Sequence, residues 1–330
     1  MSNDTDGFFA VNKKKFEKAL SLSMNAAISY LVIACGTGKS NSNSSWSVHA
    51  VEKYTGISRG RAKKAINTLI DHRVIKRLKG GTKPRYQILD GRGSKKLDPK
   101  ATYWLPNGIV MGVSEEITAL ERIRQTQNTM LLTLFLDLYS EQNLLEDGGI
   151  SQAVYRTIYE KEKINERAQY NVYGFSKKET HLTWGIEAVD KHRRNQEDLT
   201  DKEIDAGYNG TIDFFYRIEM LHSLGLIEFT SHLVDHEEDG EILHELNDEL
   251  ESEARIASEV LLSEHHDTDY EFIIPLDRHL EEATVVTTCR TIYTPRTSLT
   301  NGWYKKSTKR NTLYLNKYNE IIDKYRDSLR

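Results

Sequence analysis

Residues 45–89, "SWSVHAVEKYTGISRGRAKKAINTLIDHRVIKRLKGGTKPRYQIL", indicate how the N-terminal part of the chain folds. Apolar residues at helical spacing follow Ser47, a good N-cap, and predict a first helix. Gly56 supplies a tight turn, and a second helix is expected over residues 59–72. Two strands around the Gly80-Gly81 turn then predict a β-hairpin. The segment therefore has the order helix, glycine turn, helix and hairpin.

The second predicted helix has two different faces. We expect Ser58 to cap this helix. Its core-facing stripe consists of Ala62, Ala65, Ile66 and Leu69. The opposite face and the positions beside it hold Gly60, Arg61, Lys63, Lys64, Asn67, Thr68 and Asp71. Lysine and arginine contact phosphates or guanine edges, and Asn67 could pair with adenine. Gly60 would let the first helical turn approach the DNA backbone closely.

The predicted hairpin is strongly basic. Its cations surround the glycine tip and are Lys76, Arg77, Lys79, Lys83 and Arg85. A slender basic hairpin can lie along the phosphate backbone or enter the minor groove. Two further basic runs, residues 13–15 and 91–96, add an attraction that is independent of DNA sequence and that salt screens.

Residues 47–89, with a preceding helix expected over residues 25–35, resemble a winged helix-turn-helix DNA-binding domain. Many bacterial regulators contain such a domain. The resemblance implies that the second helix reads a DNA groove and that the hairpin acts as the wing. The residues expected to contact DNA are Ser58, Arg59, Gly60, Arg61, Lys63, Lys64, Asn67, Thr68, Lys79, Lys83 and Arg85.

The charge distribution divides the chain. Residues 1–100 contain 20 lysines and arginines against seven aspartates and glutamates, whereas the remaining residues contain 25 against 42. A basic part joined to an acidic part indicates one nucleic-acid surface and one body with another role. The alternative is an uneven but ordinary solvated surface.

At 330 residues the chain is expected to hold two or three domains. The winged helix-turn-helix DNA-binding domain is predicted over residues 1–90, and the Gly-, Ser- and charge-rich stretch 91–101 is predicted to be a basic linker. An acidic helical domain over residues 102–282 and a basic tail of strand and helix over residues 283–330 complete the prediction. The predicted fold class is α+β but predominantly helical, with a winged helix followed by a larger helical C-terminal body.

Within that body, the apolar run 129–139 must be a buried helix, and Ser151 is expected to cap the next helix. A second, winged-helix-like unit is predicted over about residues 128–246. There a helix closed by Gly225 is followed by a hairpin over residues 226–246, which repeats the helix, glycine and hairpin order. Because this helix is apolar and its hairpin acidic, the unit suits dimerisation or a protein partner better than DNA.

The segment 235–271 contains 15 acidic residues and one basic residue, which fits a solvated helix over residues 247–262 or an interaction surface. Its histidines, His236, His244, His265 and His266, match no zinc spacing, so no metal and no cofactor is expected.

Residues 283–319 reverse the charge, with seven basic and no acidic residues. A candidate second nucleic-acid contact beside aromatic residues is Lys305, Lys306, Lys309 and Arg310. The alternative is ordinary surface charge, and residues 165–209 have no predicted structure.

The tripeptide Gly38-Lys39-Ser40 matches the end of a phosphate-binding loop, G-x-x-x-x-G-K-[ST]. However, Ile33 occupies the position of the first glycine, and residues 25–35 are predicted to be a helix where the loop requires a strand. Gly36 is then expected to end this helix in the left-handed conformation. A nucleotide-dependent enzyme is therefore a less favoured alternative.

No run of ~18 apolar residues appears, and the first residues are polar and acidic, so neither a membrane span nor a signal peptide is expected. Cys35 and Cys289 show no metal spacing and are predicted to be reduced core thiols. These features predict a cytoplasmic, nucleoid-associated protein.

The sequence as a whole predicts a sequence-specific double-stranded DNA-binding protein, a bacterial or mobile-element transcription regulator that is not an enzyme. Its acidic C-terminal half is expected to form a homodimer or bind another protein. The main alternative is a plasmid or phage replication initiator with tandem winged helices, in which the basic tail adds a second DNA contact. A structural or assembly protein, whose basic half binds an acidic partner, is a further alternative.

Overall fold

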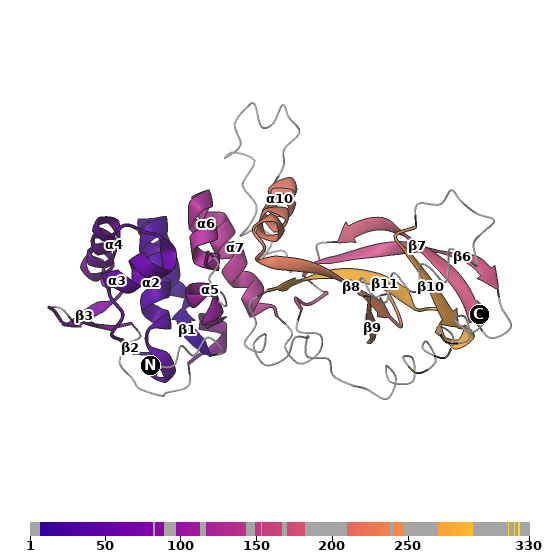
Figure 1. Cartoon of the computed structure of the whole chain (residues 1–330), viewed down its shortest axis with the longest axis horizontal. Coiled ribbons are helices and arrows are strands. Elements are labelled where there is room, and N and C mark those ends of the chain that lie inside the picture. The colour runs from indigo at the N-terminus through magenta and orange to yellow at the C-terminus, as the bar shows by residue number, and fades with distance from the viewer. Residues whose placement is uncertain are drawn as a thin grey trace, which may run out of the picture. The chain divides into compact units, whose positions relative to one another are not determined.

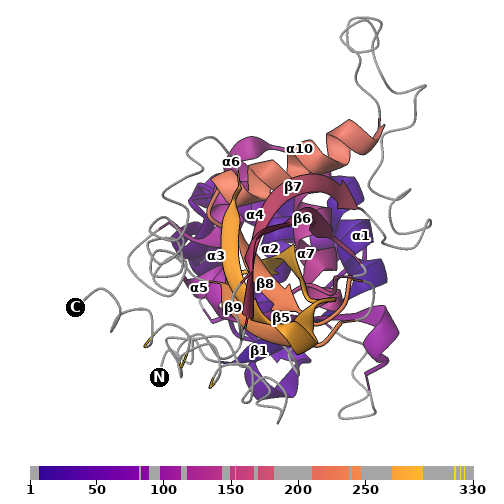
Figure 2. The same ribbon diagram turned by 90° about the vertical axis from the view of Figure 1, so that its right-hand side faces the viewer.

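The computed structural model describes residues 7–81, 83–88, 97–112, 117–142, 149–152, 154–166, 170–181, 210–237, 240–246 and 270–292, together with positions 316, 320 and 323. The chain forms two compact units. Unit 1 comprises residues 1–142, 190–227 and 291–303, and unit 2 comprises residues 143–189, 228–290 and 304–330. Figure 1 labels most helices and strands of both units, and Figure 2 also labels α1 and β5.

The fold class differs from the sequence-based prediction. Of the described residues, 42% lie in helices and 34% in strands, and the strands include a six-stranded sheet. The protein is therefore α+β and not predominantly helical. The prediction of a helical C-terminal body is wrong because residues 156–166, expected to be helical after Ser151, form a strand, as do residues 170–181, for which the sequence predicts no structure. β-branched and aromatic residues, which favour strands, occur in both segments.

The first elements of unit 1 are β1 (Phe8–Asn12), α1 (Lys13–Leu22), α2 (Met24–Cys35), the 3-10 helix η1 (Gly38–Ser40), β2 (Asn43–Ser44), α3 (Val48–Thr55), α4 (Arg59–Asp71), β3 (Lys76–Lys79) and β4 (Arg85–Gln87). Helix α2 contacts α1, α3 and α4, and every residue from Ala26 to Cys35 is buried. The helix predicted over residues 25–35 thus forms the centre of this part. Strands β2, β4 and β3 form an antiparallel sheet in that order. The hairpin β3–β4 extends away from the helices at the left of Figure 1.

The later elements of unit 1 are the 3-10 helix η2 (Pro99–Ala101), β5 (Thr102–Pro106), α5 (Gly108–Met111), α6 (Ala119–Thr126), α7 (Thr129–Ser140) and α10 (Gly210–Ser223). Helix α7 is the buried helix predicted over residues 129–139. Strand β5 pairs with β1 along its whole length, and the hydroxyl of Tyr103 in β5 donates a hydrogen bond to Asp137 in α7. The compact units therefore do not divide at the predicted linker 91–101, because the chain returns to its first strand directly after it.

Unit 2 contains β6 (Arg156–Glu166), β7 (Tyr170–His181), β8 (Ile227–Val234), β9 (Ile242–Leu246), β10 (Phe272–Asp277), the 3-10 helix η4 (Arg278–Leu280) and β11 (Thr284–Thr291). The strands form one sheet in the order β10-β7-β6-β11-β8-β9, which is strongly curled in Figure 2. Its main core cluster contains Tyr159, Tyr173, Phe175, Leu233, Leu243, Phe272, Ile274, Leu276, Leu280, Ala283 and Val285. The core of this unit is thus formed by one curled sheet.

Two predictions for this region are wrong. Strand β6 takes the place of the helix expected after Ser151, because Ile158 and Tyr159 are buried in the sheet. The elements predicted after residue 210 do form, as α10 and the antiparallel pair β8–β9. However, β11 lies beside β8, so this hairpin is part of the six-stranded sheet and not the wing of a second winged helix within residues 128–246. Local sequence could not reveal a pairing with a strand so distant in the chain.

Candidate nucleic-acid interface

Helix α4 has the two faces that its sequence predicts. Its buried residues are Ala62, Ala65, Ile66 and Leu69, and the helix contacts α2 and α3. The candidate DNA-contacting residues that are exposed are Ser58, Arg59, Gly60, Arg61, Lys63 and Lys64, and the half-buried ones are Asn67 and Thr68. Ser58 occupies the N-cap position, but its side chain makes no capping hydrogen bond.

The exposed face of α4 is cationic. Within the described part of the chain, no carboxylate lies within ion-pairing distance of the four cations Arg59, Arg61, Lys63 and Lys64. Asp71, the one acidic residue of α4, is at its last position. Exposed cations without acidic neighbours create a positive potential that attracts polyanions. The face is therefore electrostatically suited to a phosphate backbone.

The β3–β4 hairpin carries the remaining candidate contacts. Lys79, Lys83 and Arg85 are all exposed. A side-chain hydrogen bond connects the hairpin to α4, because Nη2 of Arg77 donates to Oδ1 of Asn67 at 2.9 Å. The bond favours one orientation of the hairpin relative to α4. It also occupies Oδ1 of Asn67, the atom that the expected contact with adenine would use.

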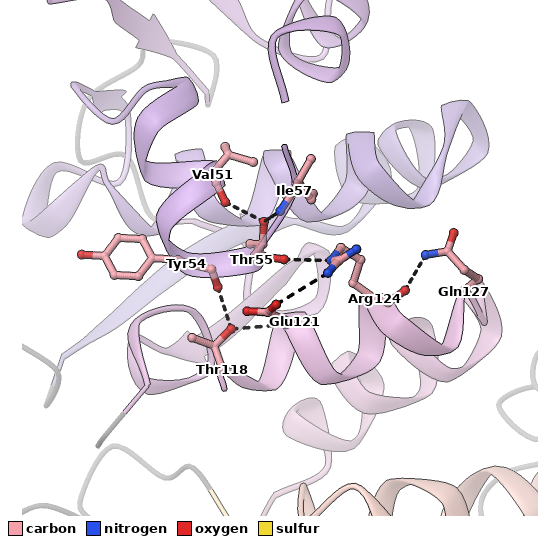
Figure 3. A network of polar contacts seen from close by, with 8 residues as sticks. All are labelled: Val51, Tyr54, Thr55, Ile57, Thr118, Glu121, Arg124 and Gln127. Atoms are coloured by element: carbon pink, nitrogen blue, oxygen red, sulfur yellow. Dashed lines mark hydrogen bonds and ion pairs between the residues drawn. The ribbon is translucent and has the colours of Figure 1, made fainter. Parts of the chain in front are cut away.

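Helix α6 supports the turn between α3 and α4 from outside (Figure 3). Gly56 in this turn has φ 62°, in the left-handed region that favours glycine. Oγ1 of Thr118 donates to the carbonyl of Tyr54 at 2.7 Å, and Nε of Arg124 donates to the carbonyl of Thr55 at 2.8 Å. The last carbonyls of a helix lack partners within it. These two donors therefore fix the end of α3 and the place where α4 begins.

Glu121 completes this support. Its Oε1 lies 3.6 Å from Nη2 of Arg124, and a Cβ added to Gly56 would lie 2.3 Å from the same oxygen. The sequence contains a signal for the start of α6, since Thr118 and Glu121 have the spacing of a capping box. The Thr118 side chain does accept a hydrogen bond from the Glu121 amide at 3.2 Å. The supporting role could not be predicted from the sequence, because nothing local identifies the helix end that α6 contacts.

The loop over residues 36–40 differs from a phosphate-binding loop, since it follows helix α2 and no strand. Gly36 does end α2, but its φ is −69°, so the predicted left-handed conformation is wrong. Glycine is required there for space, because a Cβ would lie 2.2 Å from Cγ of Trp46. Oγ of Ser40 donates to the carbonyl of Thr37 at 2.8 Å. The hydroxyl that such a loop presents to a metal is thus bonded to the chain itself.

Among the described residues, no three His, Cys, Asp or Glu side chains are placed to hold a metal ion. Cys35 and Cys289 are buried free thiols, and burial raises the pKa of both, that of Cys289 to about 12. Several predicted features lie outside the described residues, namely the helix 247–262, His265, His266, Lys305, Lys306, Lys309 and Arg310.

In the part of the chain that the structure describes, every helix is too short or too polar to cross a membrane. No protein-family model, curated protein or solved structure matches the chain. The functional assignment therefore depends on the geometry of α4, the β3–β4 hairpin and α6.

Proposed function

We propose that this chain is a sequence-specific double-stranded DNA-binding protein in which residues 24–88 form a winged helix-turn-helix. The observation that carries the proposal is the exposed cationic face of α4, which lies opposite the buried stripe that packs on α2 and α3. The major groove of B-DNA is ~12 Å wide and admits an α-helix with its side chains, which is ~10–12 Å in diameter. Helix α4 would enter this groove.

The neighbouring elements support the same function. The order along the chain is helix α2, strand β2, helix α3, a turn, helix α4 and the β3–β4 hairpin. The three strands form one small sheet. The β3–β4 hairpin would be the wing, with Lys79, Lys83 and Arg85 on phosphates. Because Arg77 bonds to Asn67, the wing and the recognition helix would approach DNA as one piece.

The proposal assigns different tasks to the side chains of α4. Arg59, Arg61, Lys63 and Lys64 would bind phosphates or guanine edges. The amide oxygen of Asn67 accepts from Arg77, so its Nδ2 group would be the donor presented to a base acceptor such as purine N7. Sequence preference at one base pair would then depend on Asn67.

We propose that the biological role is that of a bacterial or mobile-element transcription regulator whose acidic remainder dimerises or binds a protein partner. A dimer would place its two α4 helices on half-sites ~34 Å apart, one turn of DNA. The initiator alternative loses its main support, since β8–β9 belongs to a six-stranded sheet. The nucleotide-dependent alternative loses the strand that a phosphate-binding loop requires.

The test is selection of genomic DNA fragments with the full chain, followed by fluorescence anisotropy on the enriched duplex. Lys64→Ala should weaken binding to every sequence about equally, whereas Asn67→Ala should relax preference at one position by ~1–3 kcal/mol. Lys178→Ala removes an exposed lysine of β7 and serves as the matched control. Unchanged binding by both α4 variants would refute the recognition-helix assignment.

A further inference from the structure

The β3–β4 hairpin contains a β-bulge next to its tip. Arg77 lies opposite Tyr86 and Lys79 lies opposite Arg85, so Leu78 is an additional residue that has no partner across the ladder. Bulges occur where a side chain is re-aimed, and they frequently lie beside functional sites. The residue re-aimed here is an apolar one within a run of cations.

Leu78 is a large hydrophobic residue, yet it is 49% exposed. Single exposed apolar residues are common on protein surfaces and need no explanation alone. Leu78 differs through its surroundings, because Lys76, Arg77 and Lys79 flank it and are all exposed. By contrast, the exposed Phe8 and Trp104 pack against each other, with ring centroids 5.5 Å apart. A single leucine between cations suits a binding partner whose surface is polyanionic and whose interior is apolar.

The tip beyond Leu78 is slender. A Cβ added to Gly80 or Gly81 would meet no atom within 4 Å, and Gly81 has φ 88°. At Gly80 and Gly81 the tip therefore has no side chain and lies clear of other atoms. The minor groove of a duplex offers such an environment, because phosphates border a space ~6 Å wide whose floor is formed by base edges. The apolar faces of the bases become accessible there once a base step is partly unstacked.

We propose that Leu78 is a wedge that enters the minor groove and partly unstacks one base step, so that binding kinks the DNA. Lys76, Lys79, Lys83 and Arg85 hold the phosphates on either side of it. Arg77 has a different task, since its bond to Asn67 fixes the direction of the hairpin relative to α4. Apolar wedges of this kind bend DNA by ~20–90° toward the major groove. This inference rests on the proposed function and adds distortion of DNA to it.

The wedge also determines which sequences are bound well at a position that forms no base-specific hydrogen bond. Pyrimidine–purine steps such as TA and CA unstack most easily, so the preferred site contains one of them under the hairpin. Replacing that step with a stiff A-tract weakens binding by the wild type. It has little effect on a variant that lacks the wedge.

The experiment measures bending and unstacking on the selected duplex. Donor and acceptor dyes at its ends report the bend by energy transfer, and 2-aminopurine at the predicted step reports unstacking. The proteins are the full-length wild type, Leu78→Ala, Leu78→Phe and the matched control Tyr216→Ala, which truncates an exposed apolar residue of α10. Thermal unfolding of each protein verifies that it is folded.

We expect the wild type and Tyr216→Ala to bend the duplex and raise the 2-aminopurine signal. Leu78→Ala should lose both signals and bind about tenfold more weakly, with an unchanged salt slope because no charge is removed. Leu78→Phe should keep both signals. A wild type that binds tightly without bending overturns the wedge and leaves the proposed function intact. A bend that persists in Leu78→Ala also overturns the wedge, whereas a wild type that binds no DNA overturns both proposals.

Discussion

Two segments of this chain end a helix in the same way and then form a hairpin, yet they differ in what the hairpin becomes. Two residues after the last residue of α4, Arg73 has φ 58°, and two residues after the last residue of α10, Gly225 has φ 64°. In each case the next amide donates to the carbonyl five residues earlier, at 2.8 Å from Val74 and 2.9 Å from Leu226. Both ends are therefore Schellman motifs. Glycine is the residue that this motif favours, and only the second segment has it, at Gly225; Arg73 adopts the same backbone conformation in the first segment.

The hairpins then diverge. All four residues of β3 are exposed, and β3 pairs with β4 alone. Strand β8 lies between β11 and β9, and five of its eight residues are buried. The first hairpin carries lysines and arginines, whereas the described residues between β8 and β9 include Asp235, Glu237 and Glu241. The same helix end is therefore followed by two different hairpins: distant strands enclose β8 within a sheet, whereas β3 remains an exposed, basic edge strand.

Charge removal from the two hairpins should give the largest difference between them. Lys79→Ala combined with Lys83→Ala removes two proposed phosphate contacts, so DNA affinity should fall at least about tenfold and the salt slope by about 2. Glu237→Ala, on the turn of the second hairpin, should leave affinity nearly unchanged. Anisotropy titrations at several salt concentrations measure both effects. Equal losses in the two proteins would contradict the assignment of the first hairpin as the DNA-binding one.

Loss of the hydrogen bond from Arg124 of α6 to the end of α3 should lower the stability of unit 1 and leave that of unit 2 unchanged. Arg124→Ala leaves the carbonyl of Thr55 without its donor, which should cost about 1–3 kcal/mol in the free energy of unfolding of unit 1. Each unit contains one buried thiol, Cys35 in unit 1 and Cys289 in unit 2. Alkylation should therefore accelerate at Cys35 and stay unchanged at Cys289.

Arg122→Ala is the matched control for this variant, because Arg122 donates from the same helix to the carbonyl of Leu224, at the end of α10. It should leave DNA affinity close to that of the wild type, whereas Arg124→Ala should weaken it. If the two variants weaken DNA binding equally, α6 does not act through the turn between α3 and α4.

Substitutions at Arg73 and Gly225, the two residues with positive φ that follow α4 and α10, should change the free energy of unfolding by smaller amounts and in opposite directions. Gly225→Ala introduces a Cβ at positive φ, 3.1 Å from Nη1 of Arg122, and should lower the free energy of unfolding by about 1–2 kcal/mol. Arg73→Gly relieves the same backbone strain but makes the unfolded chain more flexible, so it should stabilise by less than about 1 kcal/mol. Thermal unfolding of both variants measures the difference, and a stabilised Gly225→Ala would contradict the shared geometry.

The smallest effect is expected at Gly60, where stability and DNA binding should change in opposite directions. A Cβ there meets no atom within 4 Å, so Gly60→Ala should raise the free energy of unfolding by up to ~1 kcal/mol through helix propensity. If the DNA backbone approaches this turn closely, affinity should fall by roughly threefold. Calorimetry and anisotropy on the same preparation test both parts. Affinity that rises with stability would argue against close approach at Gly60.

The sequence predicted α2, α3, α4 and the β3–β4 hairpin because apolar spacing, Ser47, Gly56 and the two tip glycines act within a few residues of each other. It also predicted the buried stripe of α4, from Ala62 to Leu69. It did not predict the sheet of unit 2, because the partner of β8 is β11, more than 50 residues away. It likewise missed the bond from Arg77 to Asn67 and the donors of α6, which exist only once the elements have packed.

The most direct test of the central claim is a salt series on the affinity of the full chain for the selected duplex and for a scrambled duplex of equal length. We predict that the logarithm of the association constant falls steeply and linearly with that of the salt concentration for both duplexes. The selected duplex should bind at least ~10³-fold more tightly than the scrambled one. A shallow slope, or equal affinity for the two duplexes, would contradict the account of α4 and its hairpin as a sequence-reading DNA interface.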